Sequence, residues 1–151
     1  MIHYRNDVRR SGVNGRALVA TAQRLLGELG ERESALSLSL VDDDAIRSLN
    51  HRFRGKDKAT DVLSFPLDDG TASTLRERLL GDVVISVDTA RRQAAQYDAS
   101  LQRELYRLLI HGLLHLKGHD HVHAGERRSM QREERRLAEA IALPWPYAKT
   151  R

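Results

Sequence analysis

Residues 108–121 read LLIHGLLHLKGHDH, and this stretch fixes the position of the most apolar helix that the chain predicts. Ser100 provides an N-cap in front of it. Leu101 and Leu105 begin an apolar stripe at helical spacing that continues through the quoted leucines. Gly118 is the kind of residue at which a helix ends. We therefore expect a buried helix over residues 100–118, with the other elements packed around it.

Three histidines of this stretch have the spacing of metal ligands. His111 and His115 are four residues apart, so they lie on one helix face, one turn from each other. A positive φ at Gly118 lets the chain leave the helix and bring His121 back over the same face. Three protein nitrogens with room for a fourth ligand are typical of a catalytic zinc. The sequence therefore predicts one zinc ion bound by His111, His115 and His121.

The spacing also matches the zinc-protease signature H-E-x-x-H-x-x-G-x-x-H, except at one position. The glutamate that would act as general base is replaced by Gly112. Proteolysis by that route is therefore disfavoured. A phosphodiester fits such a site better, because no carboxylate is present to repel it and a fixed cation stabilises the charge that develops on phosphorus.

Three more polar residues in or just after this stretch can each be interpreted in two ways. His119 and His123 are either surface residues or contacts to a bound group. Asp120 either orients a histidine or forms a turn.

Composition narrows the class of protein. The chain has 151 residues, and we expect a single domain over 1–151. It has no cysteine, so a metal ion has to bind histidine, carboxylate or water. A net charge of +4 favours a polyanion such as nucleic acid, but solvated surface arginines are the commoner explanation of such a charge. The start lacks an apolar signal core, and residues 108–116 are too short to cross a bilayer, so we expect a cytoplasmic protein.

Strand and helix patterns alternate along the rest of the chain. Strands are expected over 2–5, 35–41, 61–67 and 82–86, and helices over 16–29, 43–52, 89–97 and 126–143. Asp42 and Asp88 are the expected N-caps of the second and third of these helices, and residues 68–75 form a polar loop. The pattern predicts a small single α+β domain in which helices and a mixed β-sheet surround a zinc pocket.

A cationic partner for the metal is expected in residues 49–67, LNHRFRGKDKATDVLSFPL. Four basic residues precede the strand there, namely Arg52, Arg54, Lys56 and Lys58. Arg54 stands just before Gly55, where the helix ends, and a guanidinium there can bind a phosphate with two hydrogen bonds. Surface charges around a helix end are the other interpretation. Spacing alone does not choose between Arg54 and Arg52.

Three motifs in order resemble the YbeY family of bacterial endoribonucleases, the rRNA maturation factors. They are FRGKDKATDVLSFP, LGDVVIS and HGLLHLKGHDH, and the resemblance extends from about Leu49 to Met130. It implies one zinc on the three histidines, a catalytic role for Arg54 and an α+β fold. The family usually has proline at the position of Ala59, so we expect a looser loop here.

The resemblance also implies a function. It suggests a single-strand-specific endoribonuclease for 3′-end maturation of small-subunit rRNA and for ribosome quality control. The implied partners are precursor rRNA, small-subunit ribosomal proteins and a ribosome-assembly GTPase. Two alternatives stay open: an RNA-binding assembly factor with a structural zinc, and a metal-dependent hydrolase of another class. The attacking group, water or the RNA 2′-hydroxyl, is also open.

Overall fold

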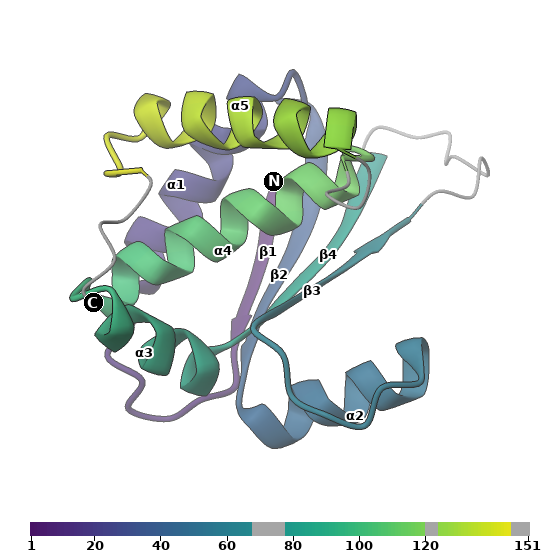
Figure 1. The fold of residues 1–151 in the computed structure, drawn as a ribbon, viewed down its shortest axis with the longest axis vertical. Helices are drawn as coiled ribbons and strands as arrows, with labels where there is room; N and C mark the ends of the chain where they lie inside the picture. The colour runs from purple at the N-terminus through teal and green to yellow at the C-terminus, as the bar shows by residue number, and fades with distance from the viewer. Residues whose placement is uncertain (68–77, 120–123, 146–151) are drawn as a thin grey trace.

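The computed structural model describes residues 1–67, 78–119 and 124–145, and within them it has four strands and five helices (Figure 1). The elements are β1 (Ile2–Asn6), α1 (Gly15–Glu28), β2 (Ser34–Val41), α2 (Asp43–Arg54), β3 (Val62–Pro66), β4 (Arg78–Ser86), α3 (Val87–Gln96), α4 (Leu101–Leu116) and α5 (Ala124–Ala140). Every predicted helix and strand is present, with ends shifted by a few residues. The predicted loop over 68–75 lies outside the described residues.

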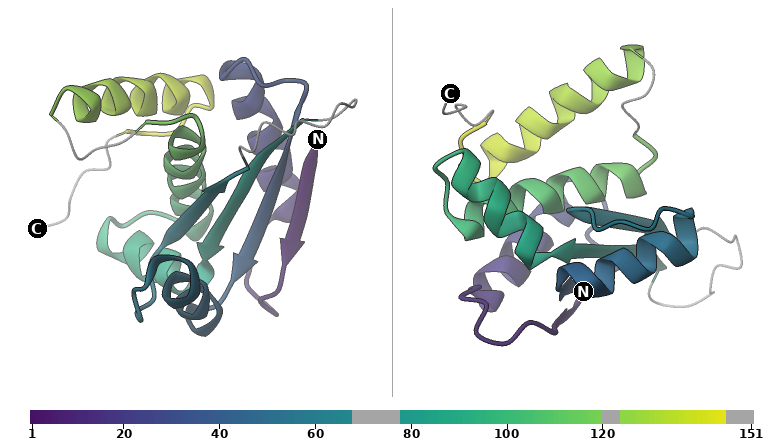
Figure 2. Two further views of the ribbon diagram at one scale, coloured as in Figure 1. Left: turned by 90° about the vertical axis from the view of Figure 1, so that its right-hand side faces the viewer. Right: turned by 60° about the horizontal axis from the view of Figure 1, so that its bottom comes forward.

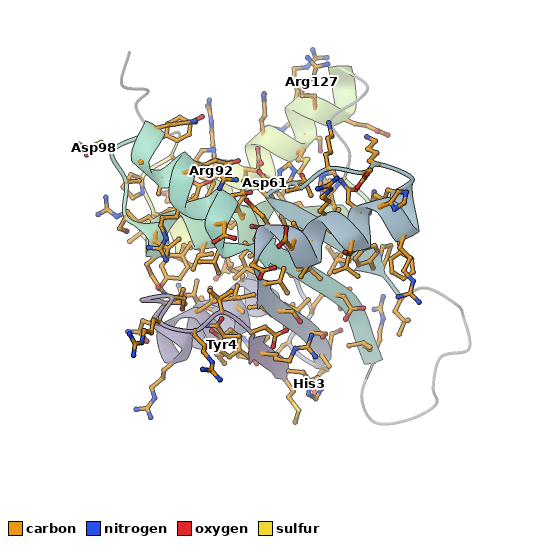
Figure 3. All side chains as sticks on the ribbon, turned by 90° about the horizontal axis from the view of Figure 1, so that it is seen from below. His3, Tyr4, Asp61, Arg92, Asp98 and Arg127 are labelled. Atoms are coloured by element: carbon orange, nitrogen blue, oxygen red, sulfur yellow. The ribbon has the colours of Figure 1, made fainter. Side chains whose placement is uncertain are left out.

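The four strands form one mixed sheet in the order β1-β2-β4-β3. β1 pairs with β2 and β2 with β4 in parallel, whereas β3 runs antiparallel to β4 and forms an edge. The predicted mixed sheet is thus confirmed. Seen from below, Asp61, just before β3, lies well apart from His3 and Tyr4 on β1, at the opposite edge (Figure 3).

The two faces of the sheet carry cores of different size. The larger core packs leucines of α1 and α4 against β2 and β4, and α3 and α5 complete it. The smaller core lies on the other face, where Ile46 of α2 packs with Val41, Leu63 and Val84. The right-hand view of Figure 2 shows α4 and α2 on opposite sides of the sheet. Side chains from both helices can therefore meet around the edge strand β3.

Helix α4 packs tightly against the sheet at Gly112. A Cβ atom at residue 112 would lie 2.9 Å from Val83 Cγ1 and 3.1 Å from Ser64 Oγ. Ser64 Oγ also donates a hydrogen bond of 3.0 Å to the Gly112 carbonyl. The structure thus gives a packing reason for the glycine, in addition to the substrate-charge interpretation suggested by the missing glutamate.

The helix caps follow the sequence with one exception. Asp42 and Ser100 accept hydrogen bonds from the first turns of α2 and α4, as predicted. The prediction of Asp88 as the cap of α3 is wrong, because Ser86 fills that position. Strand β4 runs directly into α3, so its last residue serves as the cap. The Asp88 carboxylate instead accepts a hydrogen bond of 2.9 Å from the Asp43 backbone, which ties α3 to the start of α2.

Candidate functional site

A cavity of about 540 Å³ opens at the edge strand β3, between α2 and α4. It is lined by the end of α2, the connection over residues 55–61, β3 and the second half of α4. Its charged and ionisable lining side chains are Arg54, Lys56, Lys58, Asp61, His111 and His115. The fold therefore brings together the two segments that the sequence singled out, although about sixty residues separate them.

The two histidines of α4 present their Nε2 atoms to each other. His111 Nε2 and His115 Nε2 are 3.1 Å apart, and the ring centroids are 4.6 Å apart. Zn–N bonds of about 2.0–2.1 Å in tetrahedral geometry put two ligand nitrogens about 3.3 Å apart. The pair therefore fits two ligands of one zinc ion.

The third predicted ligand, His121, lies outside the described residues, as do Asp120 and His123. Within the described ranges, no group of three histidine, cysteine or acidic side chains is arranged to hold a metal ion. His119 is described and half-buried just after the turn at Gly118, where φ is +91°. The positive φ confirms the predicted turn at this glycine.

The Glu134 carboxylate of α5 contacts His111 at Nδ1, the ring nitrogen other than the one that faces His115. Glu134 Oε2 lies 3.4 Å from His111 Nδ1, and the Glu134 side chain is only 13% exposed. With its proton on Nδ1, His111 donates to Glu134 and turns the Nε2 lone pair toward His115. Carboxylates commonly orient metal-binding histidines in this way. Sequence reasoning missed Glu134, because it is one of several acidic residues on a highly charged helix.

Arg54 is held beside the histidine pair by β3. Its Nη2 donates a hydrogen bond of 2.7 Å to the Ser64 carbonyl, and its guanidinium lies 5.5 Å from the Phe65 ring centroid. Helix α2 ends there because Gly55 adopts φ +69°. Arg52 is not part of the cavity lining, and its guanidinium lies over the Phe53 ring instead. The structure thus places Arg54, and not Arg52, next to the predicted metal ligands.

Two side chains of α2 hold the connection between α2 and β3 by hydrogen bonds. Asn50 Nδ2 donates to the Lys58 carbonyl at 2.9 Å, and Arg47 Nε donates to Asp57 at 2.8 Å. The hydrogen bond from Arg47 holds the pKa of Asp57 below its usual value. Ala59 packs against the smaller core. These contacts hold the loop in which the family proline is replaced, and Asn50 is a further residue that sequence reasoning missed.

The cavity carries more positive than negative charge. Arg54, Lys56 and Lys58 line it, and Asp61 is the acidic residue of the lining. The Asp61 carboxylate accepts a hydrogen bond of 2.7 Å from its neighbour's backbone N–H. No residue that the structure describes forms an ion pair with Lys56 or Lys58. Such a cavity attracts an anionic group to the histidine pair.

Comparison with known proteins identifies the family. The family described as Endoribonuclease YbeY matches residues 4–142. The chain belongs to the YbeY family. The match extends well beyond the three motifs and includes the whole cavity lining, so the predicted resemblance is confirmed.

Relatives named Endoribonuclease YbeY come from several bacteria. A protein of Myxococcus xanthus is 52% identical over 122 residues, which are 81% of this chain and 42% of the relative. One from Anaeromyxobacter is 49% identical over 85% of this chain and 65% of its own length. One from Syntrophotalea carbinolica is 41% identical over 142 residues, or 94% of each chain. The chain thus spans less than two thirds of the first two relatives and nearly all of the third.

The fold also has a counterpart among solved structures. The solution structure of a Thermotoga maritima protein superimposes with a TM-score of 0.64, at 25% identity, over 93% of this chain and 89% of that one. The predicted α+β fold is thus found in a solved structure as well as in this chain. In the described part of this YbeY protein, no helix is long and apolar enough to cross a membrane.

Proposed function

We propose that this protein is a zinc-dependent endoribonuclease that cleaves single-stranded segments of rRNA precursors. The observation that carries the proposal is the His111–His115 pair, with its Nε2 atoms 3.1 Å apart, facing the same cationic cavity as Arg54. The relatives' name, Endoribonuclease YbeY, supports RNA as the substrate. The roles in small-subunit 3′-end maturation and ribosome quality control, and the ribosomal-protein and GTPase partners, rest on the family resemblance.

Five side chains have a role in this proposal. His111 and His115 would hold zinc together with His121, and Glu134 would keep the His111 lone pair directed at the metal. When bound, zinc supplies a fixed positive charge that stabilises the charge developing on the phosphate. Arg54 donates one N–H to the Ser64 carbonyl, which orients its remaining donors for phosphate oxygens.

Two substitutions test this mechanism. We expect Arg54→Ala to lower kcat on a single-stranded RNA about 10²–10³-fold, since a preorganised donor to the transition state is lost. We expect His111→Ala to lose both cleavage and bound zinc, the latter measured by native mass spectrometry. Arg24→Ala is the matched control, because Arg24 lies on α1, which contributes nothing to the cavity lining. Undiminished cleavage by both site variants, in preparations shown to be free of contaminating nuclease, would contradict the proposal.

One observation favours a second candidate, an RNA-binding assembly factor with a structural zinc. The His111–Glu134 contact joins α4 to α5, so a metal on His111 would also stabilise helix packing. Under this alternative, a chelator lowers the melting temperature sharply, and Arg54→Ala weakens RNA binding with no separate effect on turnover. A chelated protein that keeps its melting temperature but loses cleavage supports the endoribonuclease.

A further inference from the structure

An exposed aromatic ring stands beside the cationic cavity. Three large apolar side chains are exposed among the residues that the structure describes, and Phe53 is the aromatic one, at 59%. It lies on α2, one residue before Arg54. Its ring centroid is 5.4 Å from that of Phe65 on β3, with 61° between the ring planes. Phe53 therefore extends from this aromatic pair into solvent.

The ring belongs to a second hollow next to the histidine cavity. This hollow has a volume of about 500 Å³ and is lined by Phe53, Arg54, Lys56 and Phe65. Arg54 and Lys56 line both spaces. A ligand whose anionic group binds these two side chains can therefore extend into both hollows.

Cationic groups flank both rings. The Arg52 guanidinium lies 5.3 Å from the Phe53 centroid, and that of Arg54 lies 5.5 Å from the Phe65 centroid. Single-stranded nucleic acid binds to this combination, because its bases stack on aromatic rings and guanidinium planes while its phosphates bind arginine and lysine. An apolar peptide fits this surface less well, because cationic side chains surround the two rings. The surroundings therefore favour a nucleotide as the occupant.

We infer that Phe53 is a stacking platform for one unpaired base of the substrate, in the nucleotide next to the phosphate that Arg54 and Lys56 bind. The inference rests on the proposed function, since the occupant is RNA. It also gives a structural source for a single-strand preference. A base inside a duplex is stacked on both faces and cannot present one to Phe53.

Three substitutions of Phe53 separate the aromatic ring from its apolar volume. In initial-rate assays of the zinc-loaded protein on a single-stranded RNA, Phe53→Ala should raise KM about 5- to 100-fold. We expect kcat to change little, because stacking acts equally in the ground and transition states. Phe53→Tyr should retain the wild-type KM, whereas Phe53→Leu should behave like Phe53→Ala. Leu67→Ala, an exposed apolar residue outside both linings, is the matched control.

Abasic substrates locate the stacked base. The same RNA, with one abasic nucleotide moved along the sequence, should raise the wild-type KM at one position near the cleavage site. Phe53→Ala should show no added loss at that position, since the partner ring is already absent. The melting temperatures of the variants control for folding, since Phe53 is 59% exposed and Phe53→Tyr keeps the ring that contacts Phe65.

The possible failures are distinguishable. If the wild type cleaves RNA and Phe53→Ala has an unchanged KM, the stacking inference alone is overturned. The same holds if Phe53→Leu matches the wild type, since no aromatic face is then needed. If the wild type neither binds nor cleaves RNA, the proposed function fails as well.

Discussion

Two clusters of charge in this molecule are built in opposite ways. Around Glu31, a buried carboxylate accepts hydrogen bonds from Ser34 Oγ and Lys117 Nζ, and Arg78 Nη1 lies 3.5 Å away. In the cavity, by contrast, Lys56 and Lys58 form no ion pair with any described residue. The first cluster joins the starts of β2 and β4 to the end of α4. Paired charge thus connects elements of the fold, whereas unpaired charge in the cavity is left for a ligand.

Removing Glu31 should have the largest effect on stability. We expect Glu31→Ala to lower the free energy of unfolding by about 2–3 kcal/mol at neutral pH. The reason is that Lys117 and the buried Ser34 hydroxyl both lose their acceptor. Chemical denaturation measures the difference. Glu33→Ala is the matched control, because that neighbouring side chain is exposed.

The contribution of Glu31 should also depend on pH. Burial raises the pKa of Glu31, but the hydrogen bonds from Lys117 and Ser34 and the nearby positive charges outweigh it and hold the pKa below its usual value. The stabilisation is therefore complete above the unfolded pKa of about 4.3 and is lost as the pH falls through the folded value. A stability difference between wild type and Glu31→Gln that persists unchanged at pH 2 would contradict this assignment.

A substitution of Glu134 tests whether this carboxylate near the cavity supports zinc binding or only the packing of the helices. We expect Glu134→Ala to weaken zinc binding about 10- to 100-fold, because His111 loses the acceptor that orients it. Competition with a chromophoric chelator measures the affinity without using cleavage. Glu133→Ala is the matched control, since its carboxylate pairs with Arg136, and the histidine whose charge acts on it is His119, not His111 or His115. Equal zinc affinity in the two variants would leave Glu134 with a helix-packing role only.

The cavity lysines should show the smallest effect, and only on binding. Lys56→Gln and Lys58→Gln should each reduce the salt dependence of RNA affinity, by about 0.7 in the slope of log K against log salt. The melting temperature should not change, because no ion pair to a described residue is lost. Arg5→Gln on the opposite sheet edge is the control. A lower melting temperature for the lysine variants would show that their charge supports the fold.

Local signals in the sequence located most of the fold and part of the site. The caps at Asp42 and Ser100 and the helix ends near Gly55 and Gly118 depend on neighbouring residues, so the sequence was sufficient for them. The same holds for His111 and His115, whose spacing on one helix brings their nitrogens together.

Contacts between elements that are distant in the sequence could not be predicted from neighbouring residues. Glu134 reaches His111 only because α5 crosses α4, and no pattern within α5 distinguishes it from Glu133. The inference that Phe53 stacks on a base required its exposure and its distance from Phe65. Spacing alone did not choose Arg54 over Arg52; the family resemblance indicated Arg54, and the Ser64 carbonyl shows how that side chain is held.

Gly112 also limits how this site can change. Ser64 accepts from Arg54 through its carbonyl and donates to Gly112 through its hydroxyl, so one serine sets the spacing between the guanidinium and the histidine helix. Any side chain at 112 would meet Val83 and Ser64 and lift α4 away from β3. A glutamate introduced there would displace His111 and His115, the proposed metal ligands, before it could serve as a base. Replacing Gly112 with glutamate would therefore not by itself convert this site into that of a zinc protease.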